Sequence, residues 1–368
     1  MSTPFAAYVA GSLNAGHFTF IDVGCSGGID ESWRVFGDRL RVVAFDASAE
    51  ECERLARLER HPNIHYRAGF VGLPVSHPFR SRVEGKPRYV RNPFLRFSAG
   101  RMFQLQKQRL AEATLEEKLL HNAWSMTKLA DPERPVVITD VLDELGWCDV
   151  DFIKIDIDGP DYEVLHSLDG HMEYIGLLAM RLEVNLFGGT GDWEHTFHNT
   201  DRFMRDRGFE LMGLDVRTYA MAALPSPFAI TAPAQSVSGR PFQAEAFYAR
   251  DPVGEDWKIL AQVMSDVKLA KLAAIFSVWG QFDAAAELVI TFRSRLETLF
   301  DVDLSLELLA GEAQSNAVRA DGYSKYIEAF EADDPRFYPP PWKPDLASVR
   351  SRTRSAWRAF LKPGPAGR

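Results

Sequence analysis

The sequence predicts an α/β protein: a doubly wound, mainly parallel seven-stranded sheet, with a helical insertion and a helical C-terminal region. Three observations predict it. Short apolar runs alternate with helix-like segments, a glycine-rich turn follows the first run, and acidic residues end several of the runs. Strands that alternate with helices give a parallel sheet with helices on both of its faces.

The seven expected strands are short and apolar, and they lie at 18–24, 41–47, 63–70, 150–158, 177–185, 209–220 and 243–251. Ser48 stands directly before the segment AEECERLARLER and is the expected N-cap of that helix. Further helices are expected from about Asp30, from about Pro160 and over 193–208, where Gly208 ends the helix. Residues 269–292 predict a helical hairpin that turns at Gly280.

Two segments break the strand–helix alternation, and they define the expected domains. We assign 1–250 to the α/β domain, with 74–135 as an inserted lid whose part 99–130 has helical composition. A helical domain is expected over 251–342, and a basic amphipathic tail over 343–368.

The composition indicates a globular protein with a core, since 46% of the residues are hydrophobic and 25% are charged. No apolar stretch reaches the roughly 18 residues of a membrane-spanning helix. The first twenty residues lack the basic and apolar segments of a secretion signal. Three scattered cysteines exclude a disulfide framework and a zinc site. We therefore expect a cytoplasmic protein with reduced thiols.

The strongest local signal is the turn that runs from Asp22 to Gly28 after the first strand. Asp46 ends the next strand, where a doubly wound fold holds ribose hydroxyls. A dinucleotide fingerprint needs glycine where Ser26 stands, and Asp22 could hold the amino group of an amino acid moiety. These features favour S-adenosylmethionine over NAD. The expected cofactor-binding residues are Asp22, Gly24, Cys25, Ser26, Gly27, Gly28, Asp46, Ala47 and Ser48. The alternative is a turn that merely needs glycine, with Asp46 as a helix cap.

Acidic residues that follow the fourth and fifth strands are the expected catalytic groups. Alternation along the fourth strand puts Asp156 and Asp158 on one face with Lys154. The catalytic candidates are Asp156, Asp158 and Glu183, and the candidate ligands for Mg²⁺ are Asp156, Glu183 and Asn185. The alternative is that Asp158 caps the next helix and that Glu183 pairs with Arg181 or Lys154. His195 and His198 are interpreted as surface histidines.

Three segments resemble the FkbM-like family of S-adenosylmethionine-dependent methyltransferases. They are FIDVGCSGG, VVAFDASAEECERL and ITDVLDELGWCDVDFIKIDIDGPDYEVLHSL, the last at 138–168. The resemblance covers roughly 18–73 and 136–250. Asp158 stands where the family usually has Glu, and Cys25-Ser26 stands where it has Ala-Asn. The resemblance implies a class I, Rossmann-like fold and O-methylation of a sugar hydroxyl.

The expected function is therefore methyl transfer to a hydroxyl of a carbohydrate-type acceptor: a surface glycan, a glycolipid or a sugar nucleotide. Two alternatives stay open, O-methylation of another small molecule and a non-catalytic cofactor-binding module. Nucleic acid is not an expected partner, because the Asn/Asp-Pro-Pro-aromatic motif of amino-methylation is absent after the fourth strand. Motifs typical of hydrolases and P-loop kinases are absent too.

Two basic segments suggest partners. Nine Lys and Arg occur between Arg80 and Arg109 against one Glu, with aromatic residues interleaved. We expect this segment to border the acceptor site and to favour an acidic acceptor. Residues 344–362 predict a basic amphipathic helix, typical of contact with the inner face of a membrane. The alternative is that this helix docks on the protein's own acidic body or on another subunit of a homo-oligomer.

Overall fold

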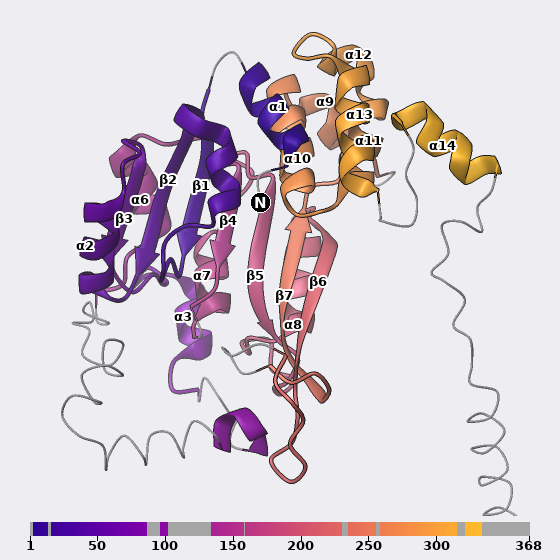
Figure 1. Ribbon diagram of the computed structural model, residues 1–368. Helices are drawn as coiled ribbons and strands as arrows, with labels where there is room; N and C mark the ends of the chain where they lie inside the picture. Colours follow the sequence, from indigo (N-terminus) through magenta and orange to yellow (C-terminus); the bar gives the residue numbers. More distant parts are fainter. Residues whose placement is uncertain are drawn as a thin grey trace, which may run out of the picture. The chain divides into compact units, whose positions relative to one another are not determined.

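The computed structural model describes residues 3–13, 16–86, 96–101, 134–157, 159–229, 235–254, 258–314 and 321–332 (Figure 1). The expected basic tail at 343–368 lies outside the described residues. Most of the helix expected over 99–130 lies outside them too, and only a short helical turn at 98–101 is described.

The fold is a seven-stranded mixed sheet with the strand order β3-β2-β1-β4-β5-β7-β6. The strands are β1 (Phe18–Val23), β2 (Leu40–Asp46), β3 (Ile64–Ala68), β4 (Phe152–Ile155), β5 (Ala179–Asn185), β6 (Glu210–Tyr219) and β7 (Arg240–Ala249). The first five are parallel, and β7 runs antiparallel between β5 and β6. All seven expected strands are confirmed, and the sheet is mainly parallel, as expected.

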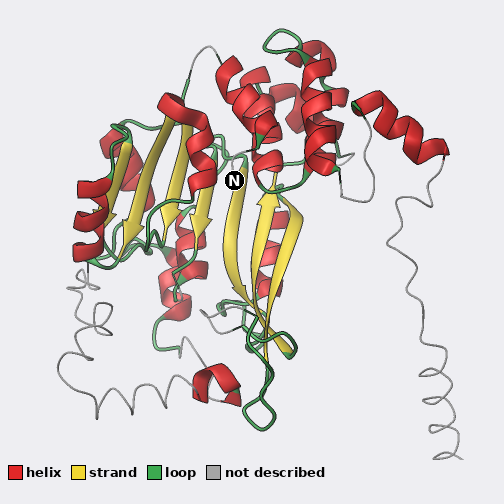
Figure 2. Ribbon diagram, in the orientation of Figure 1, coloured by secondary structure: helices red, strands yellow, loops and turns green. Residues whose placement is uncertain are grey.

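The strand order reverses between β1 and β4, and this reversal determines where a ligand can bind. The chain winds outward from β1 to β3 and then returns to β4 on the other side of β1. Helices that follow β1 and β4 therefore diverge, and a crevice opens at the carboxyl ends of these two strands. Figure 2 shows helices on both faces of the sheet, as expected for a doubly wound fold.

Aromatic side chains pack one face of the sheet against η1 (Glu31–Arg39) and α10 (Asp266–Val278). Trp33 of η1 lies 4.5 Å from Phe152 of β4, centroid to centroid, and Trp279 at the end of α10 lies 5.9 Å from the same ring. The helix expected from Asp30 is thus present as a 3₁₀ helix, which the Asp30 carboxylate begins by accepting from Ser32 N–H.

Aliphatic side chains pack the other face against four helices: α3 (Pro78–Val83), α6 (Ile138–Leu145), α7 (Asp161–Ser167) and α8 (Phe197–Arg205). Ile153 and Leu182 of the sheet are fully or almost fully buried there. The helices contribute buried Leu142, Leu165 and Met204 to the same cluster.

Several expected helices are confirmed, whereas α3 and α6 lie where no helix was predicted. Ser48 caps α2 (Ala49–Leu58), because its Oγ accepts a hydrogen bond from Glu51 N–H at 3.1 Å. The hairpin joins α10 to α11 (Phe282–Thr291) through Gly280, whose φ of 73° suits glycine. An additional helix, α1 (Pro4–Ser12), packs against α10 and was not predicted.

The sheet and the helices that follow it form one compact unit from Met1 to Leu309. It includes α9 (Lys258–Val263) and α12 (Arg293–Leu296), so the boundary expected at 250/251 does not coincide with a break in packing. The second unit starts within α13 (Val302–Ala313) and contains α14 (Tyr323–Ala332). None of the helices in the described part of the chain has the length and apolarity needed to cross a membrane.

A buried ion cluster joins α10 to the amino end of β4, opposite the crevice. Asp151 is fully buried and accepts hydrogen bonds from Lys268 Nζ at 2.7 Å, Lys271 Nζ at 2.9 Å and Thr19 N–H at 2.8 Å. Lys271 is only 2% exposed. Each charge in this cluster depends on its partner, since an isolated buried charge is costly. This is the physical reason why α10 belongs to the first unit.

Replacing Asp151 with alanine is expected to lower the free energy of unfolding by about 3–5 kcal/mol, because Lys268 and Lys271 lose their buried carboxylate partner and keep only Asp149, which is 45% exposed. Urea denaturation followed by circular dichroism measures the change. The control is Asp303→Ala, which removes an exposed partner of Arg293 and should cost less than about 1 kcal/mol. Equal effects of the two substitutions would contradict the structural role of Asp151.

Candidate functional site

The glycine-rich turn lies against the main chain that leaves β4. Gly24 has a φ of 98°, and a Cβ atom there would lie 1.9 Å from the carbonyl oxygen of Asp156. Asp156 N–H donates to Val23 O at 2.9 Å. Only glycine fits this approach, because any side chain would force the two segments apart. The turn after β1 and the loop after β4 thus form one continuous rim of the crevice.

The outer side of the turn is open. Gly27 has a φ of 85°, and a Cβ atom there would meet no other atom within 4 Å. The Cys25 side chain points away, into a hydrogen bond with Cys52 of α2. That bond, and then burial, raise the pKa of the Cys25 thiol far above its usual range. Cys25 therefore fills space beneath the turn, and the turn's backbone is what a ligand would meet.

Asp22 lies beneath the turn and is 2% exposed. Lys154 Nζ of β4 lies 3.2 Å from Asp22 Oδ1 and donates to Gly24 O at 2.9 Å. Burial raises the pKa of Asp22 to about 6, even though Lys154 acts in the opposite direction. Burial opposes the charge of Lys154 as well, but Asp22 and Asp156 raise its pKa. Asp22 therefore supports the turn through Lys154.

Asp46 ends β2 beside the same turn, as expected. Its Oδ1 accepts a hydrogen bond from Ser48 N–H at 2.7 Å, which shapes the Asp46-Ala47-Ser48 segment. Gly24 and Cys25 donate their N–H groups to Phe45 O at 2.9 and 3.0 Å. The end of β2 and the glycine-rich turn are thus directly joined, and a carboxylate oxygen can accept more than one hydrogen bond.

The loop after β4 carries Asp156, whose side chain is 29% exposed and whose Oδ2 lies 3.7 Å from Lys154 Nζ. Asp158, the second expected catalytic residue, lies outside the described residues. Asp161 was not predicted as part of the site, yet its buried carboxylate accepts from Ile157 N–H at 2.9 Å and Gly159 N–H at 3.0 Å. Asp161 therefore determines the path of the loop that presents Asp156.

Glu183 belongs to a chain of buried and partly buried ion pairs across β5, β7 and β6. Its carboxylate accepts from Arg217 at 2.8 Å and from Gln243 at 2.9 Å. Arg217 also pairs with Glu245, which pairs in turn with Arg181. Neither Arg181 nor Lys154, the alternative partners expected for Glu183, is its partner among these contacts. Because Glu183 is 2% exposed and already paired, the structure does not present it as a catalytic group.

The expected magnesium ligands do not converge. Glu183 is engaged by Arg217, and Asn185 Nδ2 donates to the carbonyl oxygen of His195 at 3.2 Å. Among the described residues, no three His, Cys, Asp or Glu side chains are grouped so that they could hold a metal ion. The described residues therefore do not fit a resident Mg²⁺.

His195 lies before α8 and connects the two loops, so its interpretation as a surface histidine was wrong. Its Nε2–H donates to the Glu183 carbonyl at 2.8 Å, and Nδ1 lies 3.9 Å from Asp161 Oδ2. The imidazole is only 13% exposed. The sequence pattern around His195 gives no sign that its ring bonds to a main-chain carbonyl twelve residues earlier. This is why the role of His195 was not predicted.

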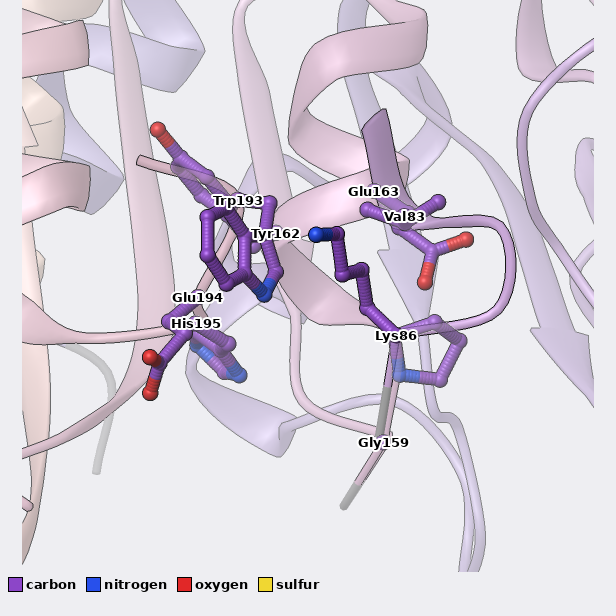
Figure 3. Close-up of a pocket in the computed structure, with 9 residues that line it drawn as sticks. Val83, Lys86, Gly159, Tyr162, Glu163, Trp193, Glu194 and His195 are labelled. Atoms are coloured by element: carbon purple, nitrogen blue, oxygen red, sulfur yellow. The ribbon is translucent and has the colours of Figure 1, made fainter. Parts of the chain in front are cut away.

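A pocket opens between the loops that follow β4 and β5 (Figure 3). Gly159, Tyr162 and Glu163 line it from the β4 side, and Trp193 and His195 line it from the β5 side. Lys86, from the start of the 74–135 insertion, closes the pocket, with its Nζ 4.6 Å from the centroid of the Trp193 ring. The pocket adjoins the loop that carries Asp156.

Part of the chain, including this region, matches a known protein family. Residues 91–211 match the family model described as the methyltransferase FkbM domain. Over these residues the chain is similar to that family. The match includes β4, the pocket loops and β5, and it starts inside the 74–135 insertion, which the sequence resemblance had left out. No curated protein matches the chain in sequence.

Solved structures that resemble this chain include three methyltransferases. Magnesium protoporphyrin IX methyltransferase from Synechocystis, with bound SAM, is 9% identical over 67% of this chain and 76% of its own, with a TM-score of 0.29. Precorrin-6y C5,15-methyltransferase from Geobacter metallireducens is 12% identical over 67% and 86%, with a TM-score of 0.29. A TehB-like SAM-dependent methyltransferase from Corynebacterium glutamicum is 10% identical over 67% and 87%, with a TM-score of 0.26.

Two glycines of the turn, Gly24 and Gly27, provide a matched test of the rim. Both have positive φ, so alanine strains the backbone by about 1–3 kcal/mol at either position. Gly24→Ala must also push Asp156 away, and we expect it to lower the free energy of unfolding by at least about 2 kcal/mol more than Gly27→Ala. Chemical denaturation of both variants measures the difference. Equal destabilisation would show that Gly24 does not need its contact with β4.

Proposed function

We propose that this chain is an S-adenosylmethionine-dependent O-methyltransferase that acts on a hydroxyl group of a carbohydrate-type acceptor. The observation that carries the proposal is the shared rim at the crevice, where the glycine-rich turn, the end of β2 and the Asp156 loop meet. The matched FkbM methyltransferase domain supports the reaction class.

The rim suits the parts of S-adenosylmethionine. The open side of the turn at Gly27 leaves room for a ligand to approach the backbone closely. Asp46, beside the turn, is suited to accept hydrogen bonds from ribose hydroxyls. When bound, the cofactor would supply an activated methyl group on a sulfonium centre.

The chain's own residues would orient the acceptor and remove its proton. Asp156 is the partly exposed carboxylate on the rim, and it lies within reach of both the turn and the pocket loop. A carboxylate there can accept the proton of an attacking hydroxyl. Asp161 and His195 hold the loop that presents Asp156. Fixed geometry of this kind can lower a barrier by roughly 7–11 kcal/mol.

The aromatic and polar lining of the pocket supports a sugar ring as the acceptor. Trp193 offers a ring face when Lys86 moves off it, and Glu163 lines the same pocket with a carboxylate. Methyl-transfer assays with labelled cofactor distinguish this acceptor from the alternative, a non-carbohydrate small molecule. The acceptors tested are lipid-linked glycans, sugar nucleotides and plain phenols. Transfer to phenols alone would exclude the carbohydrate.

Asp46→Ala is expected to weaken S-adenosylmethionine binding by about 10- to 100-fold, since charge-assisted hydrogen bonds contribute about 1.5–3 kcal/mol. Isothermal titration calorimetry measures the dissociation constant. Asp143→Ala, an exposed acid on α6, is the control and should leave it unchanged. If the unaltered protein binds NADH, or if it binds neither compound, the cofactor assignment is wrong.

Asp156→Asn is expected to lower kcat by about 100-fold or more, because the amide cannot accept the proton of the hydroxyl. The dissociation constant for the cofactor should stay within about threefold, since Asp156 faces the reacting end. Steady-state assays with an acceptor found in the screen measure kcat, and calorimetry measures binding. A fully active variant would remove Asp156 from the mechanism.

A further inference from the structure

Helix α2 supports the glycine-rich turn through one of its faces. Glu51 and Leu55 are four residues apart and therefore share that face. Leu55 packs against the turn, since its Cδ2 atom would lie 3.4 Å from a Cβ atom at Gly28. Glu51 makes a polar contact, because its Oε1 accepts a hydrogen bond from Gly27 N–H at 3.0 Å. Gly27 is thus held from the α2 side, while the space that a side chain there would occupy stays open.

The Glu51 carboxylate is itself fixed by Arg54, which lies three residues further along α2. Arg54 donates to it with Nε at 2.7 Å and with Nη2 at 2.6 Å. Hydrogen bonds from Arg54, assisted by Gly27 N–H, hold the pKa of Glu51 below its usual value, although burial opposes them. The Glu51 side chain is only 17% exposed. Glu51 therefore stays ionised at neutral pH and keeps its contact with the turn.

Glu51 also connects the turn to Asp46. Asp46 Oδ1 accepts from Ser48 N–H at 2.7 Å, and Ser48 Oγ accepts from Glu51 N–H at 3.1 Å. The Glu51 carboxylate then accepts from Gly27 N–H. A chain of hydrogen bonds thus runs from the acid that ends β2 to the turn that follows β1. The only long side chain in it is that of Glu51, so this residue determines how far the turn lies from Asp46.

We propose that Glu51 is a positioning residue for the cofactor, which holds the turn at a fixed distance from Asp46 so that one ligand meets both. This inference rests on the proposed function, which places the ribose at Asp46 and the rest of the cofactor against the turn. Gly27 and Gly28 have more backbone freedom than other residues, so an unsupported turn would lose more entropy when a ligand orders it. A turn that Glu51 orders in advance avoids this loss on binding, and its affinity for the ligand is higher.

Two ligands separate positioning from general structural support. S-adenosylhomocysteine can meet both Asp46 and the turn, whereas adenosine has the ribose but lacks the amino acid part. Glu51→Ala in the full chain should weaken binding of S-adenosylhomocysteine about tenfold, the effect of losing one hydrogen bond to a charged group. Adenosine binding should stay within about twofold. Isothermal titration calorimetry measures both dissociation constants, and circular dichroism shows whether each variant is folded.

Conservative variants show which property of Glu51 matters. Glu51→Gln keeps an oxygen that can accept from Gly27 N–H, and it should bind S-adenosylhomocysteine within about threefold of the unaltered protein. Glu51→Asp keeps the charge but shortens the side chain by one methylene, so it should weaken binding as alanine does. Glu53→Ala removes an exposed acid two residues further along α2. It is the matched control and should bind both ligands unchanged.

The proposal is overturned if Glu51→Ala binds S-adenosylhomocysteine as the unaltered protein does, if adenosine binding falls equally, or if Glu51→Gln is as weak as Glu51→Ala. Tighter binding by Glu51→Ala would overturn it too, because the carboxylate would then compete with the ligand for Gly27 N–H. Should Glu51→Ala fail to fold, or adenosine bind too weakly to measure, the glutamine and aspartate variants decide. An unaltered protein that binds no S-adenosylhomocysteine overturns the cofactor assignment as well, whereas unchanged binding by Glu51→Ala overturns the positioning role alone.

Discussion

The contact between Gly24 and the main chain of Asp156 is the constraint on which the rest of the site depends. It exists because β1 and β4 are neighbours although 132 residues separate Asp22 from Lys154. Without a side chain at Gly24, the carbonyl of Asp156 can approach the turn closely, and one rim carries both the backbone that we propose binds the cofactor and the carboxylate that we propose takes the proton. Lys154 strengthens the contact by bridging Asp22, Gly24 and Asp156.

The charged residues near the crevice differ in whether they are paired with other side chains or accessible to a ligand. Glu183, Arg217, Glu245 and Arg181 satisfy one another across three strands, and Arg181 also lies 4.5 Å from the centroid of the Trp279 ring. Buried ions are tolerated when their partners are fixed. Asp156 has the Lys154 ammonium group on one side and solvent on the other, and this partial exposure leaves it accessible to an acceptor.

The features that could be predicted from the sequence are those determined by residues close together in the chain. The strand pattern, the Ser48 cap and the pairing of the glycine-rich turn with Asp46 were all recognisable, because each is written within a few residues. The partner of Glu183 was not, since it follows from the insertion of β7 between β5 and β6. His195 and Lys86 were missed for a related reason. Their contacts are a distant carbonyl oxygen and an indole ring more than a hundred residues away in the chain.

A crystal structure with S-adenosylhomocysteine tests the central claim most directly, namely that the turn, Asp46 and the Asp156 loop form one cofactor-binding rim. The account predicts that the ribose hydroxyls donate hydrogen bonds to Asp46, that the ligand lies against the backbone at Gly27, and that the sulfur atom faces the loop of Asp156. A ligand bound elsewhere, or a sulfur atom directed away from that loop, would contradict it.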